Sequence, residues 1–208
     1  MRIVIALMLC VLSTPLPAQT ILRTFTSPDG AFQFKYSNLL VRCMEQDHDE
    51  GEHAPWFPSD SCDGYVPPCD AFRGPGNHTV ACIAYPKAKF ADYPTFDTAT
   101  FAVAEIKGPD SEKKCLSGSP SGANDLHDVT IHGAKFRAFE DDSLAASDHV
   151  RTHFYLGFHA NRCYQLSIQV VTTSSGAFDP PVKELSDKDW AEVNGLLKNC
   201  LISFRFLK

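Results

Sequence analysis

The 208-residue sequence lacks several features that identify a class of protein directly. No C-x-x-C pair is present, which argues against zinc-ribbon and thioredoxin-type sites. The formal net charge is −6, whereas a general nucleic-acid binder carries a basic face. Internal repeats, long low-complexity tracts, cofactor motifs and catalytic signatures are also absent. We therefore expect neither a nucleic-acid partner nor a built-in cofactor.

The N-terminal segment is typical of a secretory signal peptide. Arg2 supplies a positive charge, residues 3–12 form an apolar run, and the small residue Ala18 ends the segment. The run is shorter than the roughly 20 residues that span a bilayer, and no later run reaches that length. We expect cleavage near Ala18 and a secreted or periplasmic mature chain without a membrane span. Residues 19–208 then form a single domain of ordinary size.

Loss of residues 1–18 would remove Cys10 and leave seven cysteines. An exported chain meets an oxidising compartment, so disulfides are the default expectation. The candidates are Cys43, Cys62, Cys69, Cys82, Cys115, Cys163 and Cys200. Since seven is odd, at most three bridges form within the chain. Cys62 and Cys69 lie in a loop rich in proline and glycine, and we expect both to be bridged, a bond between the two being one option.

Alternating apolar residues predict an antiparallel sheet. Phe32, Phe34 and Tyr36 alternate with polar residues after the turn signal Asp29-Gly30, which indicates a hairpin. Further strands are predicted at 79–85 and 101–106, and a second hairpin at 128–139. A short helix is predicted at 110–116. Residues 44–78 show no periodicity and are predicted to form a long loop rich in proline, glycine and cysteine.

The C-terminal region predicts an amphipathic helix. Ser186 is a good N-cap, and apolar residues recur at helical spacing at Trp190, Val193, Leu196, Leu197, Cys200 and Leu201. We expect this stripe to belong to the core, with a short strand following at 203–206. The predicted fold class is α+β: an antiparallel sheet packed by helices and carrying disulfides.

The most regular alternation lies between residues 149 and 171. Even-numbered positions are apolar and odd-numbered positions are polar in both halves. If both apolar sets share one face, opposed residue numbers must add to an even value. The pattern therefore predicts Leu156 opposite Leu166, with a three-residue loop at 160–162. A two-residue turn would send one apolar set to the other face.

Three features together resemble PsbP/Mog1-like domains. They are the segment from Ser27 to Tyr36, the late hairpin, and the terminal helix followed by residues 203–206. This resemblance covers the two ends of the mature chain and implies an α/β/α sandwich around an antiparallel sheet. Proteins of this fold are mostly binding or accessory proteins, which implies a non-enzymatic role. A fold alone assigns no functional residue.

The polar face of the late hairpin is the first candidate site. Its odd-numbered side chains share one face and are His149, Arg151, His153, Tyr155 and His159. At ~3.3 Å per residue, His149 and His153 lie about 13 Å apart, too far for one metal ion. The pattern favours a shallow surface for an anion or a partner, and the alternative is an ordinary solvated sheet face.

The second candidate site is the acidic, histidine-containing stretch 47–53. Imidazole and carboxylate ligands suit zinc, nickel or copper. The ligands would be Asp47, His48, Asp49, Glu52 and His53, and the alternative is a solvated loop. Two hypotheses follow. The first is an exported, non-enzymatic binding or accessory protein for an unknown protein or small molecule. The second is a metal-binding protein or hydrolase that holds a divalent metal on this loop.

Overall fold

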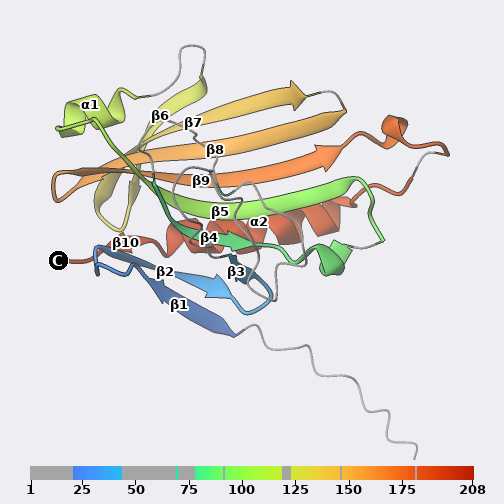
Figure 1. The fold of residues 1–208 in the computed structure, drawn as a ribbon, viewed down its shortest axis with the longest axis horizontal. Coiled ribbons are helices and arrows are strands. Elements are labelled where there is room, and N and C mark those ends of the chain that lie inside the picture. Colours follow the sequence, from blue (N-terminus) through green and yellow to red (C-terminus); the bar gives the residue numbers. More distant parts are fainter. Residues whose placement is uncertain are drawn as a thin grey trace, which may run out of the picture.

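The computed structural model describes residues 21–43, 69, 78–90, 92–118, 123–145, 147–180 and 182–208. These residues form two antiparallel sheets, one long helix and shorter helical segments (Figure 1). The predicted signal peptide and almost all of the predicted 44–78 loop lie outside the described residues. Within the described residues, no helix is long and apolar enough to cross a membrane.

The smaller sheet is built from the two ends of the described chain. Its order is β1 (Leu22–Thr26), β2 (Phe32–Ser37) and β10 (Arg205–Phe206). The predicted hairpin is confirmed, because β1 and β2 pair with Phe25 opposite Phe34. Gly30 has φ +70°, a conformation that glycine adopts without steric cost, and its N–H donates to Ser27 O at 2.9 Å.

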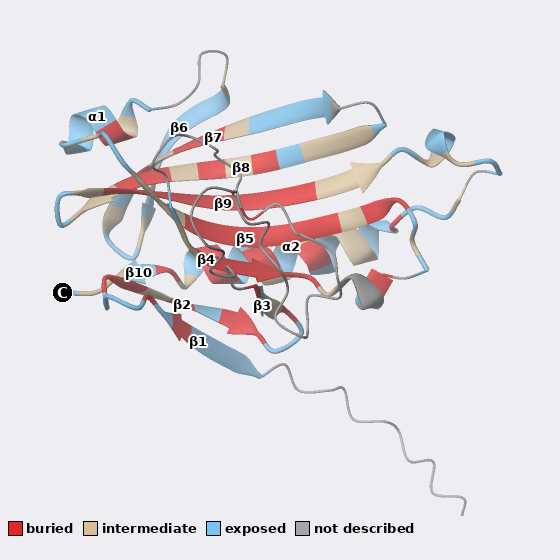
Figure 2. Cartoon of the chain, viewed as in Figure 1, coloured by how far each residue is buried: buried red, intermediate tan, exposed pale blue. Residues whose placement is uncertain are grey.

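The larger sheet has seven strands in the order β3-β4-β5-β9-β8-β7-β6. Their bounds are β3 (Val41–Cys43), β4 (His78–Ala84), β5 (Phe96–Ile106), β6 (Asn124–Ile131), β7 (Ala134–Ala145), β8 (Asp148–His159) and β9 (Arg162–Thr173). The predicted second hairpin is confirmed as β6–β7, which turns at His132-Gly133. Figure 2 shows that β5 and β9 are mostly buried while β6 at the edge is exposed.

Helices are few. α1 (Glu112–Leu116) is a single short turn capped by Ser111, and α2 (Asp187–Ile202) is the one long helix of the described chain. Two 3₁₀ segments lie at Lys87–Phe90 and Ser175–Ala177. The antiparallel sheets, the C-terminal helix and the disulfides are as predicted. The protein is, however, richer in β-structure than the predicted α+β class implies, because the described helices besides α2 are so short.

The main core lies between α2, the smaller sheet and one face of the larger sheet, called here the α2 face. It includes Phe32 and Phe34 of β2, Phe101 of β5, Tyr164 of β9 and Phe204 after α2, all at most 1% exposed. α2 contributes its buried stripe of Val193, Leu197, Cys200 and Leu201. Burying one such apolar side chain stabilises the fold by about 1.5–3 kcal/mol. The predicted amphipathic helix is therefore confirmed.

The register of the β8–β9 hairpin differs from the prediction. Leu156 lies opposite Gln165 and His159 opposite Arg162, so a two-residue turn at Ala160 and Asn161 joins the strands. Both turn residues have positive φ, +47° and +60°, as the common two-residue hairpin turn requires.

The predicted register is wrong because it assumed that only one face of the sheet is buried. The larger sheet is buried on both faces, so the two strands send their apolar residues to opposite sides. Leu166 and Ile168 of β9 pack on the α2 face, in the main core. Phe154 and Leu156 of β8 pack with Phe139 on the other face, called here the opposite face.

Two disulfides are present among the described residues, Cys69–Cys82 and Cys115–Cys163. Cys69 is bridged as predicted, but its partner is Cys82 on β4, and the option of a Cys62–Cys69 bond is not realised. Cys62 itself lies outside the described residues. Cys200 is buried in α2, and burial raises the pKa of its thiol to about 12.

Candidate ligand-binding site

A cavity of about 470 Å³ lies on the α2 face, between the helix and the β8–β9 hairpin. β8 contributes His149, Arg151 and His153, and β9 contributes Val170 and Thr172. α2 completes the lining with Asp187, Trp190 and Asn194. The observed register creates this arrangement, because the odd-numbered residues of β8 share a face with the even-numbered residues of β9.

A second hollow of about 320 Å³ adjoins the cavity. It shares His149, Thr172 and Trp190 with the first and continues toward Leu185 and Leu144. Leu144 is 79% exposed, so the outer end of this hollow has an apolar rim open to solvent. The two hollows offer an elongated binding surface with Trp190 near its middle.

The first turn of α2 positions Trp190, the aromatic residue that lines the cavity. Ser186 caps α2, its Oγ accepting from Asp189 N while Asp189 Oδ2 accepts from Ser186 N at 3.0 Å. Tyr93 donates to the same carboxylate oxygen at 3.1 Å. Asn194 donates to the carbonyl of Trp190 at 3.0 Å. Because the first turn is anchored in this way, the Trp190 backbone has a defined position beside β9.

Carboxylates on β7 hold the His149, Arg151 and His153 side chains in place. Asp142 lies opposite Arg151 in the strand register, and Glu140 lies opposite His153. Asp142 contacts His149 Nε2 at 2.5 Å and Arg151 at 3.3 Å, while Glu140 lies 2.9 Å from His153 Nδ1. Partial burial raises the pKa of Asp142, but His149 and Arg151 outweigh this effect and hold it below its usual value. Asp142 is therefore a charged anchor for the His149 and Arg151 side chains.

The structure brings together three of the five residues predicted on this face. Tyr155 lies on the same face but packs against the main core, and burial raises its pKa. His159 is farther along β8, where its ring stacks on Phe206 at 4.4 Å and its Nε2 lies 3.1 Å from Leu207 O. His159 therefore has a structural role at the other end of the strand.

The sequence prediction missed the helix contribution. Trp190 was assigned to the core stripe, and it does pack against the main core, but it also lines the cavity. A signal was available, because Asp187, Trp190 and Asn194 are spaced i, i+3 and i+7 and so lie on one side of a helix. The predicted metal-binding loop 47–53 lies outside the described residues and stays a prediction.

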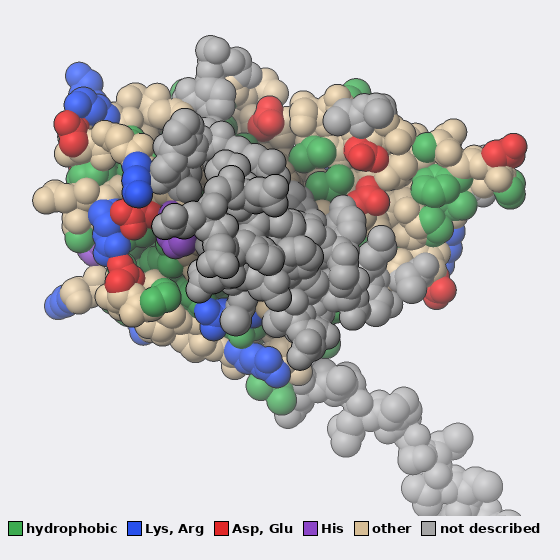
Figure 3. Space-filling view, in the orientation of Figure 1, with side chains coloured by type: hydrophobic (Ala, Val, Ile, Leu, Met, Phe, Trp, Pro, Cys, Tyr) green, Lys and Arg blue, Asp and Glu red, His purple; other side chains and the backbone are tan. Residues whose placement is uncertain are grey.

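The face shown in Figure 3 carries acidic and basic side chains interspersed around its margin. Among the described residues on that face, no extended patch of one charge is visible.

Comparison with known proteins identifies no family. No family model matches the chain, and no curated protein matches it. A solved structure from Bacteroides thetaiotaomicron VPI-5482 is similar, with a TM-score of 0.46 and 13% sequence identity. The match covers 89% of this chain and 48% of that chain, so the chain spans about half the length of that protein. Similarity at this level assigns neither fold family nor function, and the resemblance to PsbP/Mog1-like domains stays a prediction.

Proposed function

We propose that this protein is an exported, non-enzymatic binding domain that holds a small amphipathic carboxylate in the cavity between α2 and the β8–β9 hairpin. The observation that carries the proposal is the pairing of a polar wall, formed by His149, Arg151 and His153, with an apolar wall, formed by Trp190 and Val170. A ligand with one charged end and one apolar end satisfies both walls.

The volume of the cavity supports a small ligand. Sites for small molecules usually measure about 300–1,000 Å³ and combine apolar walls with a few polar groups. The cavity falls within this range at about 470 Å³. A side chain such as Trp190 supplies a large apolar surface together with one N–H donor.

Arg151 is the residue best suited to bind the carboxylate. A guanidinium has five donors in a plane and recognises carboxylates with two parallel hydrogen bonds. Asp142 takes one contact from Arg151, at 3.3 Å, so further donors remain for a ligand. Asp187, across the cavity, would accept from a hydroxyl or ammonium group of the same ligand, which extends the class to hydroxy and amino acids with an apolar side chain.

Export is part of the same proposal. Buried disulfides are typical of proteins that leave the reducing cytosol, and the apolar N-terminal segment is typical of a signal peptide. The likeness to PsbP/Mog1-like accessory domains supports a binding role. The protein would then capture its ligand outside the cytosol.

Calorimetric titration with a panel of aromatic and aliphatic carboxylates, each paired with its primary amide, tests the proposal. Phenylacetate and phenylacetamide are one such pair. Replacing Arg151 with glutamine removes a hydrogen bond to a charged group, worth about 1.5–3 kcal/mol, so the carboxylate should bind at least ~10-fold more weakly. Arg23→Gln, on exposed β1, is the matched control and should bind as the wild type does.

Two results would contradict the proposal. One is a panel in which no carboxylate binds the wild-type protein. The other is a ligand that binds equally well as acid and amide, or equally well to the wild type and to Arg151→Gln.

A further inference from the structure

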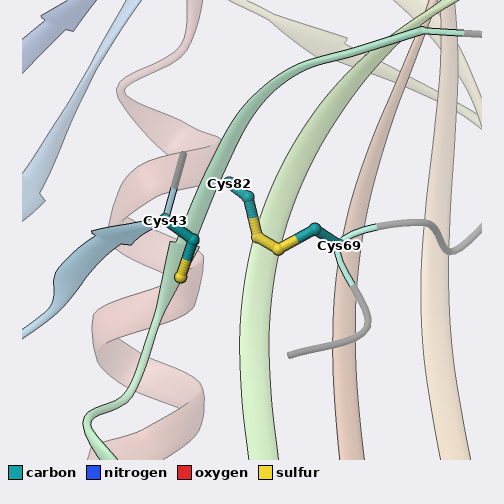
Figure 4. Close-up of side chains that lie close together, drawn as sticks. All are labelled: Cys43, Cys69 and Cys82. Atoms are coloured by element: carbon teal, nitrogen blue, oxygen red, sulfur yellow. A yellow bond between two sulfur atoms is a disulfide. The ribbon is translucent and has the colours of Figure 1, made fainter. Parts of the chain in front are cut away.

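Three cysteine sulfurs meet on the opposite face of the larger sheet, away from the proposed ligand cavity. Cys43 ends β3 and lies directly across from Cys82 on β4. Cys69 is bonded to Cys82, and the three Sγ atoms all lie within 4.8 Å of one another. Figure 4 shows Cys43 on its strand beside the Cys69–Cys82 disulfide.

The surroundings of this cluster are apolar and largely closed to solvent. Cys43 and Cys69 are 2% exposed and Cys82 is fully buried. Ala84, Ala102 and Val41 complete the apolar cluster. A group of thiolates is costly to bury in such a place unless a cation compensates the charge.

The backbone presets the positions of these sulfurs. Cys82 is paired on both sides, with Cys43 of β3 and with Ala102 of β5. Thr79 Oγ1 donates to the carbonyl of Cys69 at 3.2 Å, which ties Cys69 to the start of β4. Breaking the disulfide would therefore leave Cys43 and Cys82 held by strand pairing, and Cys69 near them through the hydrogen bond from Thr79.

We propose that reduction of the Cys69–Cys82 disulfide turns this cluster into a three-sulfur site for one thiophilic cation, copper(I) or zinc(II). A dithiol reductant supplies two electrons and two protons, one proton goes to each sulfur of the broken bond, and the reductant becomes a disulfide. The cation then binds without any change of oxidation state and displaces thiol protons to solvent.

The distances suit such an ion. Metal–sulfur bonds of about 2.3 Å place sulfurs about 4 Å apart around a shared ion, and the three sulfurs of this cluster already lie within 4.8 Å of one another. The two sulfurs that are now bonded would separate, and Cys69 is the freer to move because Cys82 is fixed within the sheet. Copper(I) and zinc both favour thiolate ligands, whereas magnesium and calcium favour oxygen.

Competition with a chromogenic chelator tests the site. The protein is first reduced with a phosphine, which is oxidised to the phosphine oxide, and is then titrated with copper(I) or zinc(II) in parallel. The reduced protein should take one equivalent of at least one of the two ions from the chelator, and the oxidised protein should take none. X-ray absorption of the loaded protein should show sulfur neighbours near 2.3 Å.

Variants separate this site from other thiols. Cys43→Ser should bind the ion at least tenfold more weakly, whereas Cys200→Ser, a buried thiol in α2, should bind as the wild type does. The double variant Cys115→Ala/Cys163→Ala removes the second reducible bond and should keep the site. If Cys43→Ser does not fold, Cys69→Ser provides the same comparison.

Several results would overturn the proposal. Equal binding by wild type and by both serine variants of the cluster is one. Uptake of neither ion by reduced protein that keeps its β-sheet circular dichroism is another. A third is reduced protein that loses this spectrum and does not regain it with either ion.

Discussion

The two faces of the larger sheet are closed by different means. On the α2 face, the long helix and the smaller sheet bury an aromatic core over the centre and leave a charged cavity at one end. On the opposite face, both disulfides attach, through Cys82 on β4 and Cys163 on β9. On the α2 face, apolar burial holds the long helix against the sheet. On the opposite face, where the described residues provide only the short helix α1, disulfides attach the covering segments to the strands.

The polar residues of the β8–β9 hairpin also differ between the two faces, in how far they are exposed. On the α2 face, Arg151 and His149 are half exposed and paired with Asp142. On the opposite face, Gln165 and Gln169 are almost fully buried, and Gln169 donates to Thr152 at 3.0 Å. The first set is available to a ligand from solvent, whereas the second is enclosed. We therefore place the proposed ligand site on the α2 face.

Removal of Cys115–Cys163 should have the largest effect on stability. The bond closes a separation of 48 residues, and in the chain-entropy picture its loss costs about 4 kcal/mol. The Cys69–Cys82 bond closes only 13 residues and should contribute about 1 kcal/mol less. Urea unfolding of the two double-alanine variants checks this order.

Carboxylate binding gives the control for the disulfide variants. The folded Cys115→Ala/Cys163→Ala protein should retain its affinity, because the cavity lies on the α2 face. A variant that loses binding while it remains folded would show that the two faces are not independent.

Gly157→Ala should have the next largest effect. Gly157 lies on the same face of β8 as Arg151, but here the face is closed, and an added Cβ would lie 2.4 Å from Cε1 of the buried Phe136. Overpacking of this kind costs about 1–3 kcal/mol, or roughly 2–12 °C in melting temperature for a chain of this size.

Gly195→Ala is the control for this prediction. An added Cβ on this exposed glycine of α2 meets no atom within 4 Å. Alanine there should stabilise the helix by about 0.5–1 kcal/mol. Loss of stability in Gly195→Ala, or none in Gly157→Ala, would contradict the description of the α2 face.

A smaller effect is expected from the ion pair that joins the two sheets. Arg162 of β9 bonds Asp29 in the β1–β2 turn at 2.5 Å and Glu105 of β5 at 3.3 Å. The hydrogen bonds from Arg162 and Ser27 lower the pKa of Asp29 to about 2. Because the folded pKa lies below the unfolded value of 3.8, this contribution is complete above about pH 4 and is lost as the pH falls toward 2.

Solvent limits the size of the Asp29 effect. Since the side chain of Asp29 is 46% exposed, screening should keep the contribution below about 1 kcal/mol. Urea unfolding of wild type and Asp29→Asn at pH 7 and pH 3 provides the measurement. The difference between the two proteins should be smaller at pH 3, and a larger difference would contradict the assigned pKa.

Local patterns were enough to predict most of the elements. The alternation of Phe32, Phe34 and Tyr36 located β2, and the spacing from Trp190 to Leu201 located α2, because both patterns record burial along one element. The same logic placed His149, Arg151 and His153 on one face of β8. These predictions depend only on side-chain periodicity, which the fold preserves.

Long-range relations were not predictable in this way. The register of β8 and β9 depends on whether the second face of the sheet is covered, and alternation within the hairpin does not contain that information. The Cys69–Cys82 pairing and the approach of Trp190 to β8 likewise depend on contacts between distant parts of the chain. The predicted face was therefore identified without the helix that makes it a cavity.

The most direct test of the central claim is an NMR titration with the tightest-binding carboxylate of the panel, followed through side-chain N–H signals. The indole signal of Trp190 and the amide signal of Asn194 report on the cavity, while the amide signals of Gln165 and Gln169 report on the opposite face. We predict that the first pair shifts as the ligand is added and that the second pair stays in place. Shifts confined to Gln165 and Gln169 would contradict the proposed site.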